Sequence, residues 1–227
     1  MTFALTLAVT ILLCFVLRTP LMKWPVAFYA ITAAAMAAYV FGSLSGTMPR
    51  EVWLALFQPI QKALVPLALF IVVMYIGLFP RHSKVSQWLR PVRAELSIVA
   101  CILMAGHVVI YIGSYLPRLF NGSTLDLNIL ASFIVAMVLF VLLLVLGITS
   151  FQFVKKHMDH KAWKSVQKLA YAFFVLSYVH LLLILLPAAM RGGVQAIESV
   201  VAYTIIFGIY IIGRPIRAFL DAQSEPQ

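Results

Sequence analysis

The chain has 227 residues, of which 63% are hydrophobic and only 11% are charged. A soluble domain of this length carries far more charge, so the composition predicts an integral membrane protein. The net charge of +10 does not indicate a nucleic-acid partner, because the basic residues stand in short clusters between long apolar runs.

Seven apolar segments of the chain approach or exceed the length of about 20 helical residues that crosses the hydrocarbon core. They cover residues 2–17, 24–44, 63–80, 94–117, 128–150, 166–189 and 195–213. The first segment is followed, not preceded, by a basic residue, Arg18, which favours a retained helix over a cleaved signal peptide. We therefore predict an all-α polytopic membrane bundle of about seven transmembrane helices.

The basic residues predict how the bundle is oriented. With the N-terminus outside, 13 of the 17 Lys and Arg residues fall in segments that face inside. Cytoplasmic loops are enriched in Lys and Arg, so this distribution favours an N-out, C-in topology. We expect two N-terminal helices and an interfacial loop in 1–62, a helical bundle in 63–213, and a cytoplasmic tail in 214–227.

Two of the apolar segments each contain one histidine, His107 in "ILMAGHVVIYI" and His180 in "FVLSYVHLLLI". His107 follows Arg93 by 14 residues, and His180 follows Lys168 by 12. At about 1.5 Å per residue, both rings lie about 20 Å from the inner boundary, on helices that run in the same direction. Two imidazoles at one depth are typical of a haem iron held from both faces. The alternative is that each histidine only forms a hydrogen bond between helices.

Three further residues are candidates for the same site. Arg118 follows His107 by 11 residues, and Arg191 follows His180 by 11. Guanidinium groups suit carboxylates, so both are candidates to bind haem propionates, although both also fit the role of interfacial anchors. Tyr111 lies one turn after His107 on the same helix face, where it is expected either to contact a haem edge or to pack in the core.

Two stretches of the sequence resemble a known family. "PVRAELSIVACILMAGHVVIY" and "GITSFQFVKKHMDHKAWKSVQKLAYAFFVLSYVHLLL" are similar to the ferric reductase-like transmembrane domain. Within that family they look closest to the haem-binding membrane subunit of the bacterial periplasmic methionine sulfoxide reductase system. The resemblance covers about residues 63–187 and rests on the spacing and order of the helices.

The departures from the family pattern concern the number of haems. The family commonly carries two histidines on each of two helices, which hold an inner and an outer haem. Here Arg93 stands 14 residues before His107, and Gln167 stands 13 residues before His180. The resemblance therefore implies one haem b per chain, with His107 and His180 as the axial iron ligands. The seventh span is a second departure, because this branch typically has six.

The resemblance implies a b-type cytochrome of the bacterial cytoplasmic (inner) membrane. Such a protein acts in electron transport as an oxidoreductase subunit, with electrons passing from quinol to an acceptor outside. Its expected partners are membrane lipids, a quinone and a separate redox protein, with no nucleic acid. One alternative is a non-catalytic haem binder for sequestration or sensing. A second is a transporter or scaffold without haem, which would be colourless.

Overall fold

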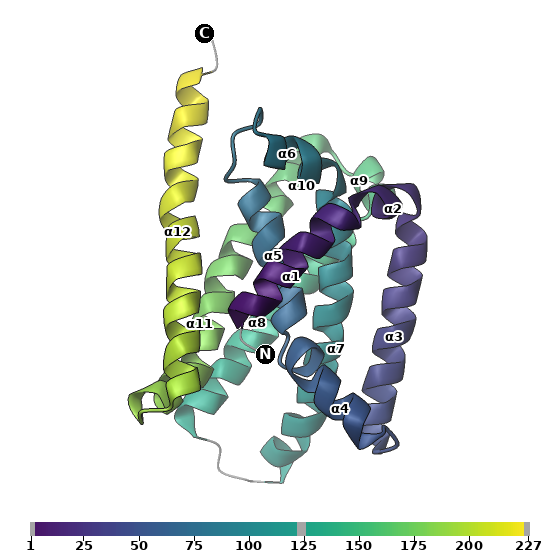
Figure 1. Cartoon of the computed structure of the whole chain (residues 1–227), viewed down its shortest axis with the longest axis vertical. Coiled ribbons are helices and arrows are strands. Elements are labelled where there is room, and N and C mark those ends of the chain that lie inside the picture. Colours follow the sequence, from purple (N-terminus) through teal and green to yellow (C-terminus); the bar gives the residue numbers. More distant parts are fainter. Residues whose placement is uncertain (1–2, 122–125, 225–227) are drawn as a thin grey trace.

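A computed structural model describes residues 3–121 and 126–224, so residues 1–2 and 225–227 of the predicted N-terminal region and tail lie outside it. Within the described residues the chain is helical and contains no strand (Figure 1). The α-helices are α1 (Phe3–Val16), α2 (Arg18–Lys23), α3 (Pro25–Ser45), α4 (Arg50–Leu56), α5 (Leu64–Ile76), α6 (Lys84–Leu89), α7 (Arg93–Phe120), α8 (Leu127–Ser150), α9 (Gln152–His157), α10 (His160–Gln167), α11 (Leu169–Met190) and α12 (Val194–Ser224). A π-helical turn, η1 (Phe57–Gln61), precedes α5, and a 3-10 turn, η2 (Arg90–Val92), precedes α7.

Six helical runs among the described residues are long and apolar enough to cross a membrane. They are Pro25–Ser45, Arg50–Ile76, Lys84–Phe120, Leu127–Ser150, His160–Met190 and Val194–Asp221. The predicted all-α membrane bundle is therefore confirmed. The N-out topology stays a prediction, because length and composition do not distinguish the two sides of a membrane.

The first predicted span is shorter than the other six. Helix α1 has 14 residues, which gives a length of about 21 Å against a hydrocarbon core of about 30 Å. It packs across α5, and its residues Phe3 and Cys14 are buried in two separate core clusters. The N-terminal region is thus joined to the core of the bundle.

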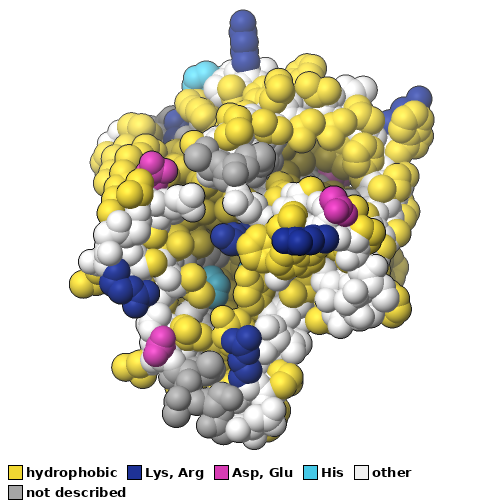
Figure 2. Space-filling model, turned by 60° about the horizontal axis from the view of Figure 1, so that its bottom comes forward, with side chains coloured by type: hydrophobic (Ala, Val, Ile, Leu, Met, Phe, Trp, Pro, Cys, Tyr) yellow, Lys and Arg dark blue, Asp and Glu magenta, His cyan; other side chains and the backbone are white. Residues whose placement is uncertain are grey.

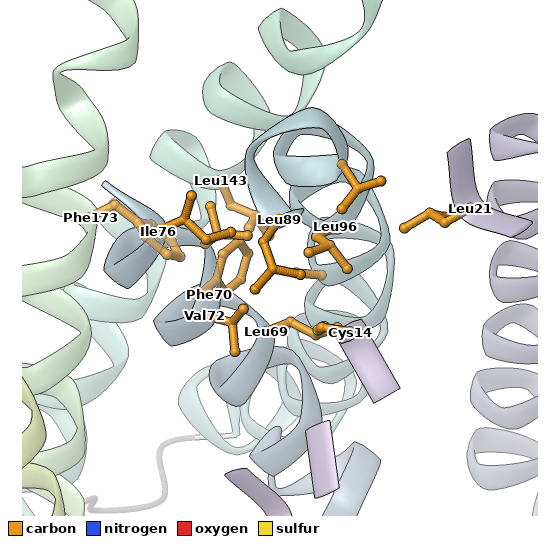
Figure 3. Close-up of a cluster of buried hydrophobic side chains, with 13 residues drawn as sticks. Cys14, Leu21, Leu69, Phe70, Val72, Ile76, Leu89, Leu96, Leu143 and Phe173 are labelled. Carbon is orange, nitrogen blue, oxygen red and sulfur yellow. The ribbon is translucent and has the colours of Figure 1, made fainter. Parts of the chain in front are cut away.

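Helix α5 is the buried centre of the bundle. Ten of its 13 residues are buried, and they surround the whole helix instead of forming one stripe. A helix that is apolar on all sides is stable only when other helices enclose it. One side of α5 joins the cluster around Phe70, and Figure 3 shows side chains from α1, α2, α6, α7, α8 and α11 converging there. The other side joins the cluster around Phe174 and Phe207.

The two ends of the bundle differ in charge. Helices α2, α6, α9 and α10 lie together at the end that is uppermost in Figure 1, and we call this the basic end. Arg18 ties α2 to α6 there: its Nε donates to the Trp88 carbonyl at 2.7 Å, and its guanidinium lies 4.3 Å from the centre of the Trp88 ring. Helix α12 continues past Gly213 to Ser224, so the expected tail begins as part of this helix.

Helices α3 and α7 pack closely where α7 has a glycine. A Cβ atom at Gly106 would overlap the side chain of Met36, which is buried on α3. The close approach of these helices therefore depends on the missing side chain. Because His107 is the next residue along α7, this contact also fixes the position of His107 relative to α3.

We predict that Gly106→Ala lowers the free energy of unfolding by about 1–3 kcal/mol, because Met36 must leave its packed position. The matched control is Gly208→Ala on α12, where a Cβ meets no atom within 4 Å. Helix propensity makes that change neutral, or stabilising by up to about 1 kcal/mol. The measurement is the thermal unfolding midpoint of each detergent-purified variant. Equal midpoints for the two variants would contradict the packing argument.

Candidate functional site

The two predicted histidines lie on the helices expected to carry them. His107 is in the middle of α7, and His180 is in the middle of α11. Helix α8 packs against both of these helices. The two histidines, 73 positions apart in the chain, therefore lie on two helices that share α8 as a neighbour.

The ring of His107 is held by a backbone carbonyl. Its Nδ1 lies 2.6 Å from the carbonyl oxygen of Gln61. A carbonyl oxygen only accepts hydrogen bonds, so in the neutral ring Nδ1 must carry the proton. The Nε2 atom of His107 then presents its lone pair, which is the state required of a metal ligand.

The Gln61 carbonyl is turned toward α7 by an irregular piece of backbone. The π-helical turn η1 ends at Gln61, and Ala63 follows in the left-handed conformation with φ of 56°. This conformation is rare for a residue with a Cβ and costs about 1–2 kcal/mol. The Gln61 side chain is also fixed, because its Oε1 accepts from the Tyr39 hydroxyl of α3 at 3.1 Å.

The ring of His180 is held in the same way by α8. Its Nδ1 lies 2.9 Å from the Ser132 hydroxyl and 3.1 Å from the Ser132 carbonyl oxygen. A proton on Nδ1 satisfies both the carbonyl and the hydroxyl oxygen, and it leaves the Nε2 lone pair available. Ser132 is almost fully buried, with 1% of its surface exposed. A buried serine in an apolar helix needs a partner, and His180 is that partner.

A row of aromatic rings follows His107 along α7. The Tyr111 ring centre lies 4.7 Å from that of His107, and Tyr115 stacks on Tyr111 at 6.0 Å. Arg118 comes next, with its guanidinium 5.5 Å from the centre of the Tyr115 ring. Tyr111 therefore contacts His107 as expected, while Arg118 reaches the row only through Tyr115. Arg191 is exposed just after α11, and the described part of the chain records no contact between it and these residues.

Three contributors to the site were not identified from the sequence. Tyr115 has a signal in the sequence, because it continues the four-residue spacing from His107 through Tyr111. Ser132 has a weaker one, as a polar residue inside the apolar run 128–150. Gln61 contributes its backbone carbonyl to His107, and such a contribution leaves no trace in residue types.

The two positions where the resemblance expects an inner pair of histidines hold Gln167 and Arg93. Gln167 donates from Nε2 to the Thr149 hydroxyl of α8 at 3.0 Å, and Trp163 donates to the Thr149 carbonyl at 3.0 Å. Arg93 lies at the start of α7 with an exposed side chain. Among the described residues there is also no cluster of three or more His, Cys, Asp or Glu side chains able to hold a metal ion.

Two hollows border α7. A cavity of about 310 Å³ is lined by Gln61, Ile110 and Ser114, among others, and so lies next to the carbonyl that holds His107. An open apolar groove of about 760 Å³ runs along the contact between α3 and α7, and Met36 and Gly106 form part of its wall. Figure 2 shows a histidine side chain visible between hydrophobic side chains on the face away from the basic end, with basic side chains around it.

We predict that both histidines adopt the Nδ1-protonated tautomer, because each Nδ1 faces a carbonyl. The measurement is ¹⁵N NMR of the histidine-labelled protein without haem, with signals assigned by His107→Ala and His180→Ala. The exposed His82 serves as the reference, since no carbonyl selects its tautomer in the structure. A protonated Nε2 at either His107 or His180 would contradict the geometry.

Comparison with known proteins agrees with the fold. The model of the family described as "Ferric reductase like transmembrane component" matches residues 60–178, which are 119 of the 227 residues. A protein of Treponema pallidum (strain Nichols), described as "Uncharacterized protein", is 38% identical over 214 residues. The alignment covers 93% of this chain and 59% of that relative, so the chain spans well under two thirds of the relative's length.

No solved structure matches the chain. The family match begins just before Gln61, includes His107 and ends two residues before His180. It does not distinguish branches of the family, so the predicted similarity to the methionine sulfoxide reductase subunit stays a prediction. Since the match covers more than half of an all-helical membrane bundle, the chain belongs to the ferric reductase-like transmembrane family.

Proposed function

We propose that this protein is a b-type cytochrome that carries electrons through one haem held between His107 and His180. The family supports the broader part of this proposal, a redox or haem-related role in a membrane. The proposed location is the bacterial cytoplasmic membrane. The proposed direction of transfer is from quinol, which reaches the site through the bilayer, to an acceptor protein outside.

The state of the two imidazoles is the observation that carries the proposal. A histidine that ligates a metal usually donates its second ring N–H to a carbonyl or carboxylate. Both His107 and His180 have this arrangement, through Gln61 and Ser132. Neither Nε2 makes a hydrogen bond within the described residues. Two polar rings that served only to join helices would be expected to use their outer nitrogens as well.

The chemistry of this donor set fits a haem better than a bare metal ion. Haem iron needs only two axial ligands from the protein, whereas a protein zinc site usually takes at least three. Bound haem would supply a one-electron carrier that alternates between ferric and ferrous iron. His107 and His180 would hold the haem between α7 and α11, while Gln61 and Ser132 orient the two imidazoles.

Arg118 and Arg191 are the proposed partners of the haem propionates. Eleven residues make slightly more than three helical turns, so each arginine shares a face with its histidine at a distance of about 16 Å along the axis. An arginine side chain spans part of that distance and binds carboxylates with two parallel hydrogen bonds. Tyr111 lies between His107 and Arg118 and is proposed to contact the haem edge.

The region toward the basic end supports a second candidate function. Gln167 and Arg93 stand where the family carries an inner pair of histidines, and Gln167 is already bonded to Thr149. A single haem far from the cytoplasmic face cannot relay electrons from a cytoplasmic donor through an inner haem. A haem binder for sequestration or sensing, without turnover, is therefore the alternative proposal.

We predict that the purified protein shows sharp low-spin absorption bands when reduced with dithionite, at about one haem per chain. His107→Ala and His180→Ala should each abolish these bands, because one axial ligand is lost. The matched control is His157→Ala, whose Nδ1 also lies near a carbonyl, that of Phe153, but on α9 at the basic end. Unchanged bands in both site variants, or a colourless wild type supplied with haem, would contradict the proposal.

The same preparation distinguishes the two candidate functions. An electron carrier is reduced by a quinol analogue and reoxidised by an external acceptor. A storage or sensing protein binds the same haem but is reduced by dithionite alone. The comparison uses the wild-type protein, so it does not depend on the stability of any variant.

We predict that Ser132→Ala binds haem about 10-fold more weakly and raises its reduction potential. The variant keeps the Ser132 carbonyl as acceptor but loses the hydroxyl 2.9 Å from His180 Nδ1. A less strongly hydrogen-bonded imidazole donates less charge to iron, which destabilises the ferric form. Ser177→Ala on α11, where the hydroxyl only bonds the Phe173 carbonyl, is the control. If the two variants have the same haem affinity and the same reduction potential, Ser132 does not support His180 as a haem ligand.

A further inference from the structure

Two arginines from different helices meet at the basic end. Arg214 of α12 donates from Nε to the Tyr171 hydroxyl of α11 at 3.0 Å, and its guanidinium lies 5.5 Å from the centre of that ring. Arg93 of α7 reaches the end of α5, where both of its terminal nitrogens lie 3.8 Å from the position of a Cβ on Gly77. Arg93 also lies within electrostatic range of Tyr171, Tyr210, Arg90 and Arg214. Helices α7, α11 and α12 thus contribute side chains to one cluster beside the end of α5, and Arg90 adds a third positive charge near Arg93.

No carboxylate balances these charges. Among the residues that the structure describes, the only salt bridge joins Arg217 to Asp221, one turn apart on α12. Glu95 is close to Arg93 in sequence, but a separation of two residues corresponds to about 200° around a helix, so the two side chains leave α7 on different sides. Arg93 has neither a hydrogen bond nor an ion pair within the described part of the chain. Its five N–H donors are therefore available.

We propose that Arg93 and Arg214 bind a phosphate group at the basic end of the bundle. Planar guanidinium groups match phosphate oxygens with paired hydrogen bonds. The Tyr171 hydroxyl accepts from Arg214, so its own O–H remains free to donate to the same anion. The Arg93 side chain is exposed, which lets an anion reach it.

The phosphate has two chemical sources, an anionic phospholipid headgroup or a soluble phosphate. Basic pockets between transmembrane helices near the cytoplasmic surface are suited to lipid headgroups. The cluster lies where α5 ends and α7 begins, close to the boundary of the apolar segments. The proposal does not depend on haem binding, since none of its residues touches His107 or His180.

The test is thermal unfolding of the full-length protein in dodecyl maltoside, with three additions compared. These are phosphatidylglycerol, phosphatidylcholine at the same mole fraction, and inorganic pyrophosphate against sodium chloride of equal ionic strength. The variants are Arg93→Gln, Arg214→Gln and the double variant. Lys161→Gln is the control, because Lys161 is an exposed basic residue at the same end, outside the cluster.

Ligand binding to the folded state raises the unfolding midpoint, and we expect a rise of several degrees for the wild type and for Lys161→Gln. The double variant should lose most of this rise. A rise with phosphatidylglycerol alone identifies a lipid headgroup, and a rise with pyrophosphate beyond that with sodium chloride identifies a soluble phosphate. An equal rise in the double variant, or in phosphatidylcholine or sodium chloride, overturns the proposal.

A second measurement tests the proposal even if the glutamine variants fail to fold. Arg93→Lys keeps the charge but loses the planar pair of donors, so it should fold and bind more weakly. Native mass spectrometry of this variant and the wild type measures phosphatidylglycerol or pyrophosphate retained per chain. Retention that is equal in the two proteins, or absent from the wild type in both arms, also overturns the proposal.

Discussion

The structure depends on which groups bond to the backbone donors and acceptors that are left unpaired at one break in a membrane helix. Backbone groups inside the hydrocarbon have no water to bind, so an interrupted helix is stable only if other protein groups take the freed donors and acceptors. The candidate span Arg50–Ile76 is interrupted at Gln61 and Ala63. The Gln61 carbonyl accepts from His107, and the Gln61 side chain accepts from Tyr39. One irregular turn therefore joins α3, α5 and α7 and also selects the tautomer of His107.

The second histidine depends on ordinary helix packing. Helix α8 is regular, and a single buried residue, Ser132, offers both its hydroxyl and its carbonyl to His180. This arrangement holds only while α8 stays in register with α11, and the bond from Asn128 to the Leu183 carbonyl supports that register. Helix α5 separates the two major core clusters, so both halves of the site rest on the same buried helix.

The bundle is chemically asymmetric along its length. In its middle, His107 lies beside a row of aromatic rings on α7. At the basic end the side chains are polar and charged: Gln167 is hydrogen-bonded within the protein, whereas Arg93 has no hydrogen bond or ion pair among the described residues. A permanent cation without an ionic partner suits an anion, and this is the physical reason for the proposed phosphate site there.

The sequence by itself determined the all-helical membrane class, the long helices and the positions of His107 and His180 within two of them. These follow from apolar length and from rise per residue, which are local properties. The partners of the histidines were decided by tertiary structure, because Gln61 contributes a backbone carbonyl and Ser132 belongs to another helix. Packing also decided that α1 lies across α5 and that Arg118 stands behind Tyr115. Contacts between distant segments depend on how side chains interlock, and no single helix encodes that.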